Sequence, residues 1–453
     1  MLIMSHSGLR GIAPKWLTPE LAIRAAIAFT RVTNSTRVLV CRDTRTTSPL
    51  LAKAVIAGLL SEGVRVIDAG IAPTPVAFFA VRKLNLDGAI VITGSHNPGM
   101  WNAIKMASRE GTFLKGDLMD KVISSLRDVR PTCKDYGKVM KFDIVDIYIK
   151  FAKEIVDQDY IKKASPKVLV DPASGAACHV TPRLLKEVGC KVTTINSSPE
   201  VYFREYEPTK SSLKTTALIL KSKYDIGLAH DCDGDRLVLI SPKGEVLDPN
   251  FTLALALEGF YEKFNHRGSF VINFATSNLV RDIAKKLGFN VYYSKIGEVH
   301  VLEEMERRGA LIGGEGSSAG VIFRELNPTR DGILAALMIL EYLSREHISI
   351  DEYIREAPKY YGFHDKVSLD SSSNVEILLS QIENVVKKDL EYDIEVLDGI
   401  KVIIDDNSWV LFRPSRTEFC MRIIGESPNI KLTERIRKWA LSLMEGIIKG
   451  KYP

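Results

Sequence analysis

The sequence predicts an α/β fold of three related domains with mixed, mostly parallel sheets, followed by a smaller C-terminal α+β domain. Short apolar runs rich in β-branched residues alternate with amphipathic helical stretches, which is typical of β-α-β units. This alternation starts again near residue 168 and near residue 270, and it changes after about residue 355. A chain of 453 residues is also too long for one ordinary domain.

The first segment opens with a clear helix start, because Thr18 can cap the helix, Pro19 fits its first turn and Glu20 faces its positive end. After this helix we expect strands and helices in alternation, at 38–41, 48–62, 64–68, from 74 onward, and at 89–93. The second and third segments each repeat a strand, a helix and a strand, at 168–171, 181–189 and 192–195 and at 270–274, 277–287 and 291–293.

The last segment has a different order of elements. A strand, a helix, two paired strands and a final helix are expected at 366–369, 375–388, 400–404, 408–412 and 432–449. We therefore expect four domains, which span residues 1–140, 141–245, 246–355 and 356–453.

The composition excludes several classes of protein. A net charge of +5 is spread along the chain and forms no basic patch of the kind that binds nucleic acid. No apolar run reaches the roughly 18–20 residues that a membrane span needs, and the first residues lack the basic segment of a signal peptide. The six cysteines stand singly without a CxxC pair, which favours neither a zinc site nor a disulfide framework. These features predict a cytoplasmic protein with no nucleic-acid or membrane partner.

A serine directly follows one expected strand, in the stretch VITGSHNPGMWNAIK at 91–105. Ligands of parallel α/β sheets bind at the carboxyl ends of the strands, so Ser95 lies where a functional residue is expected. The stretch is not a G-x-S-x-G elbow, because Thr93 replaces its first glycine, and a hydrolase triad is unsupported. The glycines and proline predict a sharp, exposed loop, with Asn102 and Lys105 within reach of a bound anion. The alternative is a turn serine that bonds its own backbone.

Three aspartates, Asp231, Asp233 and Asp235, stand at alternate positions after another expected strand. Carboxylates so close repel one another unless a cation lies between them, and oxygen ligands favour magnesium or calcium over zinc. An EF-hand requires Gly and Glu at the positions of Arg236 and Pro242, so that motif is excluded. We expect this loop to be exposed, and a solvated acidic turn without a metal is the alternative.

Two further loops carry polar side chains in close succession. The glycine-rich stretch GGEGSSAG at 313–320 contains Glu315, Ser317 and Ser318, although loops of glycine and serine are common without a function. The stretch RPSRTE at 413–418 groups guanidinium and hydroxyl side chains, which together with loop N–H groups suit a phosphate dianion. A solvated basic turn is the alternative for this second loop, whose polar residues are Arg413, Ser415, Arg416 and Thr417, with Arg422 nearby.

Together these motifs resemble the α-D-phosphohexomutase family, which includes phosphoglucomutase, phosphomannomutase and phosphoglucosamine mutase. The family's serine loop T-A-S-H-N-P corresponds to TGSHNP at 93–98, and its metal loop D-x-D-x-D-R to residues 231–236. Its sugar loop G-E-x-S corresponds to 314–317, its phosphate loop R-x-S-x-T-E to 413–418, and its N-terminal G-x-R-G to 8–11. The motifs occur in the family's order across essentially the whole chain.

The resemblance implies four domains around a central cleft, to which each domain contributes a loop. Ser95 would carry a phosphate, Mg²⁺ would be held by that phosphate and the three aspartates, and Lys105 and Arg10 would flank the transferred phosphoryl group. Glu315 and Ser317 would hold sugar hydroxyls. The other residues expected to bind substrate are His96, Asn102, Arg236, Lys295, Glu298 and Ser318 and, at the non-reacting phosphate, Arg413, Ser415, Thr417 and Arg422.

The resemblance also implies a reaction, in which hexose 1-phosphate and hexose 6-phosphate interconvert through phosphoserine and a hexose 1,6-bisphosphate. The sugar loop looks one residue longer than in many relatives and lacks their histidine, and Glu298 stands where some phosphomannomutases have histidine. We expect activity on glucose and mannose phosphates, with glucosamine phosphate as the alternative substrate. Alternatives from other classes are a metal-dependent sugar phosphatase and a non-catalytic sugar-phosphate-binding protein. We expect a monomer or a homodimer.

Overall fold

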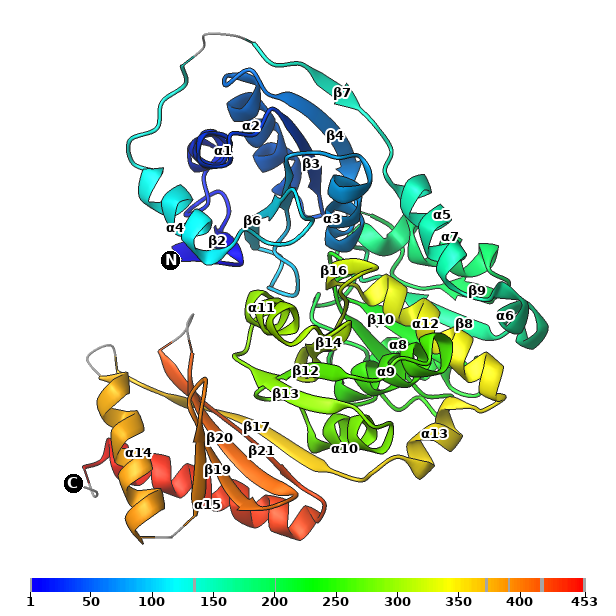
Figure 1. The fold of residues 1–453 in the computed structure, drawn as a ribbon, viewed down its shortest axis with the longest axis vertical. Helices are drawn as coiled ribbons and strands as arrows, with labels where there is room; N and C mark the ends of the chain where they lie inside the picture. The colour runs from blue at the N-terminus through cyan, green and yellow to red at the C-terminus, as the bar shows by residue number, and fades with distance from the viewer. Residues whose placement is uncertain are drawn as a thin grey trace.

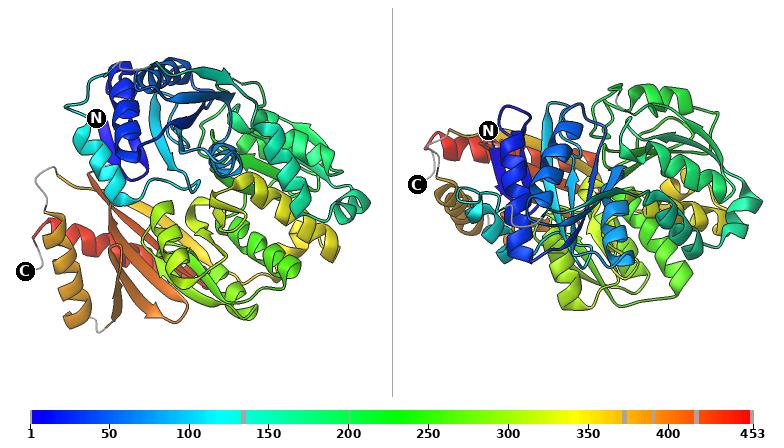
Figure 2. Two further views of the ribbon diagram at one scale, coloured as in Figure 1. Left: turned by 45° about the horizontal axis from the view of Figure 1, so that its top comes forward. Right: turned by 90° about the horizontal axis from the view of Figure 1, so that it is seen from above.

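The computed structural model describes residues 2–132, 136–199, 201–370, 374–389, 392–415 and 419–450. Four parts of the chain follow one another in an arc, from the N-terminal part at the top of Figure 1 to the C-terminal part at its lower left. Figure 2 shows from two further sides that the C-terminal part lies at the same end of the molecule as the blue N-terminal helices. The first and last parts of the chain therefore face each other across the opening of the arc.

The first part contains a seven-stranded sheet in the order β1-β2-β6-β5-β3-β4-β7. Strands β5, β3, β4 and β7 are parallel, and β1, β2 and β6 pair antiparallel. The side chain of Thr18 caps the first helix as expected, since it accepts the N–H of Leu21. The elements are β1 (Leu2–Ser5), β2 (Gly8–Ile12), α1 (Pro19–Thr33), β3 (Arg37–Arg42), α2 (Ser48–Leu60), β4 (Arg65–Ile71), α3 (Thr74–Lys83), β5 (Gly88–Ile92), β6 (Trp101–Ser108), α4 (Gly116–Ser125) and β7 (Val139–Lys141).

The second and third parts contain mixed sheets in the orders β11-β10-β8-β9 and β13-β12-β14-β15-β16. The second part consists of α5 (Val145–Ile155), α6 (Gln158–Ala164), β8 (Lys167–Asp171), the 3₁₀ turn η1 (Ala176–His179), α7 (Thr181–Glu187), β9 (Lys191–Thr194), α8 (Lys214–Leu220), β10 (Ile226–His230) and β11 (Leu237–Ile240). The third consists of α9 (Asn250–Phe264), β12 (Ser269–Asn273), α10 (Asn278–Lys286), β13 (Asn290–Ser294), α11 (Glu298–Arg308), β14 (Ile312–Glu315), η2 (Gly316–Ser318), β15 (Gly320–Phe323), β16 (Asn327–Arg330), α12 (Gly332–Glu346) and α13 (Ile350–Glu356).

The fourth part is an antiparallel sheet in the order β17-β21-β20-β19-β18 with two helices. It consists of β17 (Tyr361–Ser368), α14 (Val375–Asp389), β18 (Asp393–Val396), β19 (Ile400–Asp405), β20 (Ser408–Pro414), β21 (Cys420–Ser427) and α15 (Ile430–Ile448). Three mixed α/β parts and one α+β part confirm the predicted fold class. The limits of the four domains stay predictions.

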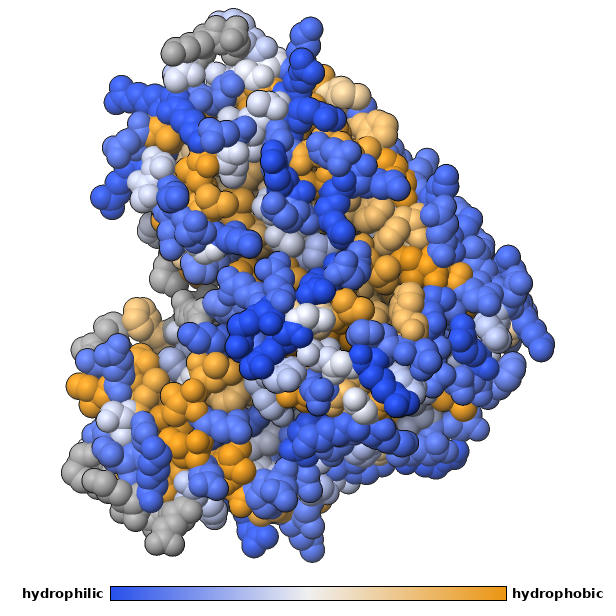
Figure 3. Space-filling view, viewed as in Figure 1, coloured by the Kyte–Doolittle hydropathy of each residue, from blue (hydrophilic) through white to orange (hydrophobic). Residues whose placement is uncertain are grey.

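The largest hydrophobic cluster runs through the first three parts, and the fourth part has a cluster of its own. One cluster joins Phe79 of α3, Tyr148 of α5 and Leu334 of α12, whereas the fourth part has its own core around Phe412. Figure 3 shows polar side chains over most of this face, and apolar ones gathered over the strands of the C-terminal sheet. A smaller buried cluster of Phe274, Ala275, Trp409 and Leu411 joins the third part to the fourth.

Five of the six cysteines are buried and form no disulfide with one another, and Cys133 lies outside the described residues. Among the residues that the structure describes, no helix is both long enough and apolar enough to cross a lipid bilayer.

Two buried charged residues hold the fourth part against the third. The carboxylate of Glu426 accepts the hydroxyl of Ser277 (2.6 Å), the N–H of Asn278 (2.5 Å) and the indole N–H of Trp409 (2.9 Å), so it caps α10 from a neighbouring domain. Lys401 is only 3% exposed. Its ammonium lies 3.9 Å from the ring centre of Trp409, and it donates a 3.3 Å hydrogen bond to the carbonyl of Phe274.

This interface should make stability depend on pH. Burial lowers the pKa of Lys401 to about 8. The folded protein holds this proton less tightly than the unfolded chain does, so the unfolding free energy should rise as the pH passes through 8 toward 10.5. By pH 10 the wild type should gain about 2 kcal/mol relative to Lys401→Met, measured by denaturant unfolding at pH 7 and pH 10. The matched variant Lys431→Met, at an exposed position on α15, should show no such difference. A constant difference for Lys401→Met would contradict the assignment.

Candidate active site

The predicted serine lies at the carboxyl end of β5 in a strained backbone conformation. Ser95 has φ of 49°, in the left-handed region that residues other than glycine rarely adopt. Its hydroxyl donates to Asp231 Oδ2 at 2.8 Å, and its N–H donates to Thr93 Oγ1 at 2.9 Å. Pro98 is exposed, but Ser95 is only 2% exposed, so the expectation of an exposed serine loop is wrong for the serine itself. The second domain covers it.

A buried arginine that sequence reasoning missed fixes the backbone of this loop. The guanidinium of Arg45 donates to four loop carbonyls at 2.6–3.0 Å, those of residues 95, 97, 98 and 101, and to Asp43. It packs so closely that a Cβ at Gly94 would lie 2.7 Å from its guanidinium carbon. Glycine is therefore required at position 94 while Arg45 keeps this place. No local pattern could have identified its role in the loop, because the four carbonyls that Arg45 binds lie 50 to 56 residues along the chain.

The three aspartates follow β10 and meet the serine from the second domain. Possible ligand oxygens of Asp231, Asp233 and Asp235 lie within 4.8 Å of one another. All three residues are 0% exposed, so the expectation of an exposed acidic loop is wrong. One oxygen of Asp233 and one of Asp235 are buried and accept no hydrogen bond from any described residue. Buried carboxylate oxygens without donors are the ligands that a hard divalent cation takes.

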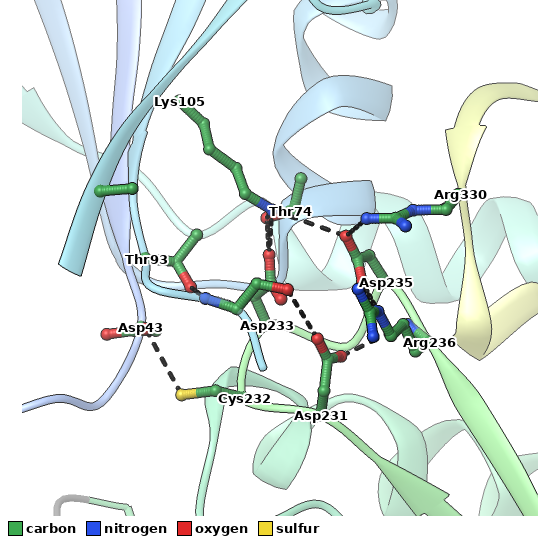
Figure 4. Close-up of polar contacts among 12 residues, drawn as sticks. Asp43, Thr74, Thr93, Lys105, Asp231, Cys232, Asp233, Asp235, Arg236 and Arg330 are labelled. Carbon is green, nitrogen blue, oxygen red and sulfur yellow. Dashed lines mark hydrogen bonds and ion pairs between the residues drawn. The ribbon is translucent and has the colours of Figure 1, made fainter. Parts of the chain in front are cut away.

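Cationic side chains from the first and third domains surround this loop (Figure 4). Lys105 of β6 approaches Asp233 at 2.6 Å and Asp235 at 3.5 Å. Arg330 at the end of β16 approaches Asp235 at 2.6 Å. Thr74, at the start of α3, donates both its hydroxyl and its N–H to Asp233. Three domains therefore contribute to one buried charged cluster.

The surroundings shift the protonation of this cluster in opposite directions. Burial raises the pKa of Asp231, and the neighbouring charges of Asp235 and Asp233 raise it further. Burial alone would also raise the pKa of Asp235, but Arg330 and then Lys105 lower it well below its usual range. Burial disfavours the charged form of Lys105, yet Asp233 and then Asp235 raise its pKa overall. Binding of a cation or a phosphate would therefore change the protonation of this cluster.

Of the other residues predicted in the first two domains, some lie near the serine and aspartate loops and one does not. Arg10 on β2 faces Asn97 of the serine loop at 3.5 Å, and burial lowers the pKa of His96 well below its usual range, so its ring is neutral. Arg236 lies beside Asp235 at 3.9 Å. Asn102 does not reach the site. It is 0% exposed, and its amide holds Thr47, Ser48 and the N–H of Ala103, which corrects its expected role in substrate binding.

The sugar loop follows β14, again at a strand end. Glu315 accepts the N–H of Gly297 (2.8 Å) and the amide of Asn273 (3.1 Å) with one oxygen, and Arg330 (2.8 Å) with the other. Ser317 is exposed, and Ser318 donates to the Glu315 carbonyl at 3.3 Å. Ser317 is thus the residue of this loop that is presented to solvent.

The neighbouring loop after β13 carries Lys295, which is exposed. Glu298, at the start of α11, is buried and accepts the hydroxyl of Thr329 and the N–H of Arg330. Its second oxygen lies 3.1 Å from the side chain of Arg330. Glu298 therefore holds Arg330 in place, and its expected role as a direct sugar ligand stays a prediction.

The predicted phosphate loop lies on the fourth sheet, apart from the serine. Arg413 of β20 stands directly opposite Arg422 of β21, which stands opposite Lys366 of β17, so three cations form a row across three strands. Like charges in such positions repel and favour a bound anion. Ser415 directly follows β20, and its N–H donates a hydrogen bond to the carbonyl of Cys420. Thr417 and Arg416 lie outside the described residues.

An aspartate connects this row to the sugar side of the site. Asp398 accepts Arg413 Nε at 2.8 Å and the N–H of Ile296 at 3.0 Å. Ile296 precedes Gly297, whose N–H holds Glu315. The phosphate row and the sugar loop are therefore joined by hydrogen bonds across two domains.

Comparison with known proteins finds similar proteins over nearly the whole length of this chain. Models of the phosphoglucomutase/phosphomannomutase α/β/α domains I, II and III match residues 1–131, 146–244 and 248–361. A phosphoglucomutase/phosphomannomutase of Thermococcus kodakarensis is 37% identical, and a protein named probable phosphoglucosamine mutase of Pyrococcus abyssi is 35% identical, each over 98% of both chains.

A solved structure of a phosphoglucomutase/phosphomannomutase family protein from Burkholderia thailandensis has the same fold. Its TM-score is 0.85 at 24% identity, covering 100% of this chain and 99% of that one. With three matched domain models and relatives that align from end to end, this chain belongs to the phosphoglucomutase/phosphomannomutase family of α-D-phosphohexomutases.

Proposed function

We propose that the protein is a Mg²⁺-dependent mutase that interconverts hexose 1-phosphates and hexose 6-phosphates through a phosphorylated Ser95 and a hexose 1,6-bisphosphate. The observation that carries the proposal is the contact of Ser95 Oγ with Asp231 at 2.8 Å, inside a buried cluster that also holds Lys105. A serine in this setting is placed to exchange a phosphoryl group, and the buried thiols fit the expected cytoplasmic location.

The aspartate loop supports the choice of metal. Its donors are carboxylate oxygens, two of them buried without a hydrogen-bond donor among the described residues, which fits Mg²⁺ better than a metal that prefers nitrogen or sulfur. Asp231, Asp233 and Asp235 would hold the ion together with the phosphate on Ser95. When bound, Mg²⁺ supplies positive charge to the phosphoryl oxygens as charge develops on them.

The protein's own groups account for the remaining steps. Phosphoserine gives its phosphoryl group to the free hydroxyl of the sugar phosphate: the bond from phosphorus to Ser95 Oγ breaks, a bond to the sugar oxygen forms, and the proton of that hydroxyl ends on Ser95 Oγ. The sugar bisphosphate then turns end for end, and Ser95 takes the other phosphate. Lys105 and Arg10 lie beside the serine loop, where their charges stabilise the phosphoryl group in transit.

A single distal phosphate site serves both orientations of the sugar. The cation row of Lys366, Arg422 and Arg413 fits a dianion and lies on a different domain from Ser95. Either end of the bisphosphate can therefore be held there while the opposite end reacts. Exclusion of water between the two transfers would prevent loss of phosphate.

Two observations bear on the identity of the sugar, and they favour different substrates. In the site, Glu315 and Glu298 already pair with Arg330 at 2.8 Å and 3.1 Å, so each has a cationic partner before a 2-ammonium group could bind, which favours glucose and mannose phosphates. Among relatives, the name phosphoglucosamine mutase favours glucosamine phosphate as a second candidate. Ser317, which is exposed, can accept or donate to either substrate.

The phosphoserine step can be tested directly by mass. Purified wild-type protein should contain a population heavier by ~80 Da, the mass of one phosphate on serine, and Ser95→Ala should lack it. Wild type should convert glucose 1-phosphate to glucose 6-phosphate when primed with a trace of glucose 1,6-bisphosphate, and chelation of divalent metal should stop it. Inorganic phosphate as the main product would identify a phosphatase instead, and no turnover of any hexose phosphate would identify a binding protein.

The sugar preference can be ranked on one enzyme preparation. Values of kcat/KM for glucose, mannose and glucosamine 1-phosphates should differ by less than about a hundredfold, which corresponds to roughly 2.7 kcal/mol of transition-state binding. Glucosamine 1-phosphate preferred by more than that factor would establish the second candidate and exclude a permissive site.

The cation row predicts a binding defect. Arg422→Met removes a charge-assisted contact worth about 1.5–3 kcal/mol, so KM for glucose 1-phosphate should rise by at least tenfold, with a smaller loss in kcat. Initial-rate kinetics over a range of substrate concentrations would separate the two constants. Arg437→Met is the matched control, because Arg437 pairs with Asp365 on the outside of the same domain at 2.7 Å. Equal KM values for Arg422→Met and wild type would remove Arg422 from the phosphate site.

A further inference from the structure

Arg330 connects three carboxylates that come from separate segments of the chain. Its side chain is 10% exposed and contacts Asp235 of the metal loop at 2.6 Å, Glu315 of the sugar loop at 2.8 Å and Glu298 of α11 at 3.1 Å. Asp235 and Glu315 belong to different domains, and Arg330 donates a hydrogen bond to each of them from a different nitrogen. The planar guanidinium therefore fixes the position of one carboxylate relative to the other.

The charges of this group depend on one another. Burial would lower the pKa of Arg330, but Asp235, then Glu298 and Glu315, raise it well above its usual range. Removing one member of a buried charged group leaves the others uncompensated. Because Glu315 and Asp235 share Arg330, a change in the position or charge of one carboxylate alters the stabilisation of the other.

Each carboxylate also faces a different ligand. Asp235 keeps its second oxygen buried without a hydrogen bond from a described residue, which leaves that oxygen for a cation. Glu315 belongs to the loop that also presents the exposed Ser317 to the sugar side. Arg330 thus lies between the carboxylate that would bind the metal and the carboxylate that would bind the sugar. It contacts both carboxylates, and it is not itself a ligand of either group.

We propose that Arg330 is a positioning residue that makes metal binding and sugar-phosphate binding cooperative. The proposal rests on the proposed function, because it assigns one ligand to each carboxylate. A sugar hydroxyl that orders Glu315 also orders Arg330, and through it Asp235, before the metal arrives. By linkage, the metal must then strengthen sugar binding by the same factor.

Binding of the two ligands can be measured without turnover in a Ser95→Ala background. Mn²⁺ is the probe, since it takes the same oxygen ligands, and free Mn²⁺ is measured by electron paramagnetic resonance with and without saturating glucose 6-phosphate. Glucose 6-phosphate should lower the Mn²⁺ Kd by at least about fivefold, the lower range of ordinary coupling between sites. The ratio of the two Kd values should fall to near one when Arg330→Met is added.

Two further variants separate coupling from charge compensation. Arg330→Lys keeps the positive charge but lacks the fork that holds two carboxylates, so it should bind Mn²⁺ more tightly than Arg330→Met and still show a ratio near one. It also carries the test if Arg330→Met fails to fold, as judged by circular dichroism. Arg324→Met is the matched control, because Arg324 pairs with Glu325 at the surface of the same domain at 3.0 Å, and it should keep the full ratio.

The outcomes distinguish this proposal from the proposed function. A ratio near one in Ser95→Ala itself, or an unchanged ratio in both Arg330 variants, would overturn the coupling role even if the wild type is an active mutase. Absence of mutase turnover in the wild type would overturn the proposed function, while the Mn²⁺ measurement would still report whether Arg330 couples the two ligands.

Discussion

The burial of three aspartates in one loop is the constraint on which the rest of the site depends. Carboxylates removed from water cost several kcal/mol each unless cations and hydrogen-bond donors offset their charge. Asp233 receives Lys105 from the first domain, and Asp235 receives Arg330 from the third. The hydrophobic cluster that runs through these three domains holds the donors in place. The site is therefore a property of the packed assembly of domains and of no single loop.

Local signals in the sequence were sufficient for the fold class and for part of the elements. Caps such as Thr18 and Ser277, and apolar runs of strand length, act over a few residues, so most of the expected elements lie close to their observed bounds. The strand expected at 366–369 instead starts at Tyr361, and strands such as β6 and β21 were not predicted. The loops of the site were found for the same reason, because their functional groups stand side by side in the chain. The three aspartates are an example, since two-residue spacing after a strand brings them together without any tertiary information.

Long-range contacts and burial were not visible in the sequence. Arg330 meets Glu315 and Asp235 at separations of 15 and 95 residues, and nothing near it distinguishes it from a surface arginine. Asn102 was assigned to substrate because it lies next to the right motif, but its side chain turns into the protein. Proximity in sequence predicts which loop a residue belongs to. It does not predict which way the side chain points.

The hydrogen bonds of Arg45 to the serine loop have a consequence for the proposed reaction cycle. Its guanidinium holds four main-chain carbonyls, and none of these bonds involves the hydroxyl of Ser95. In the proposed reaction the serine would therefore change from neutral to doubly charged, and back, on a main chain that Arg45 holds independently of the hydroxyl. Little energy is then spent on rebuilding the loop at each transfer.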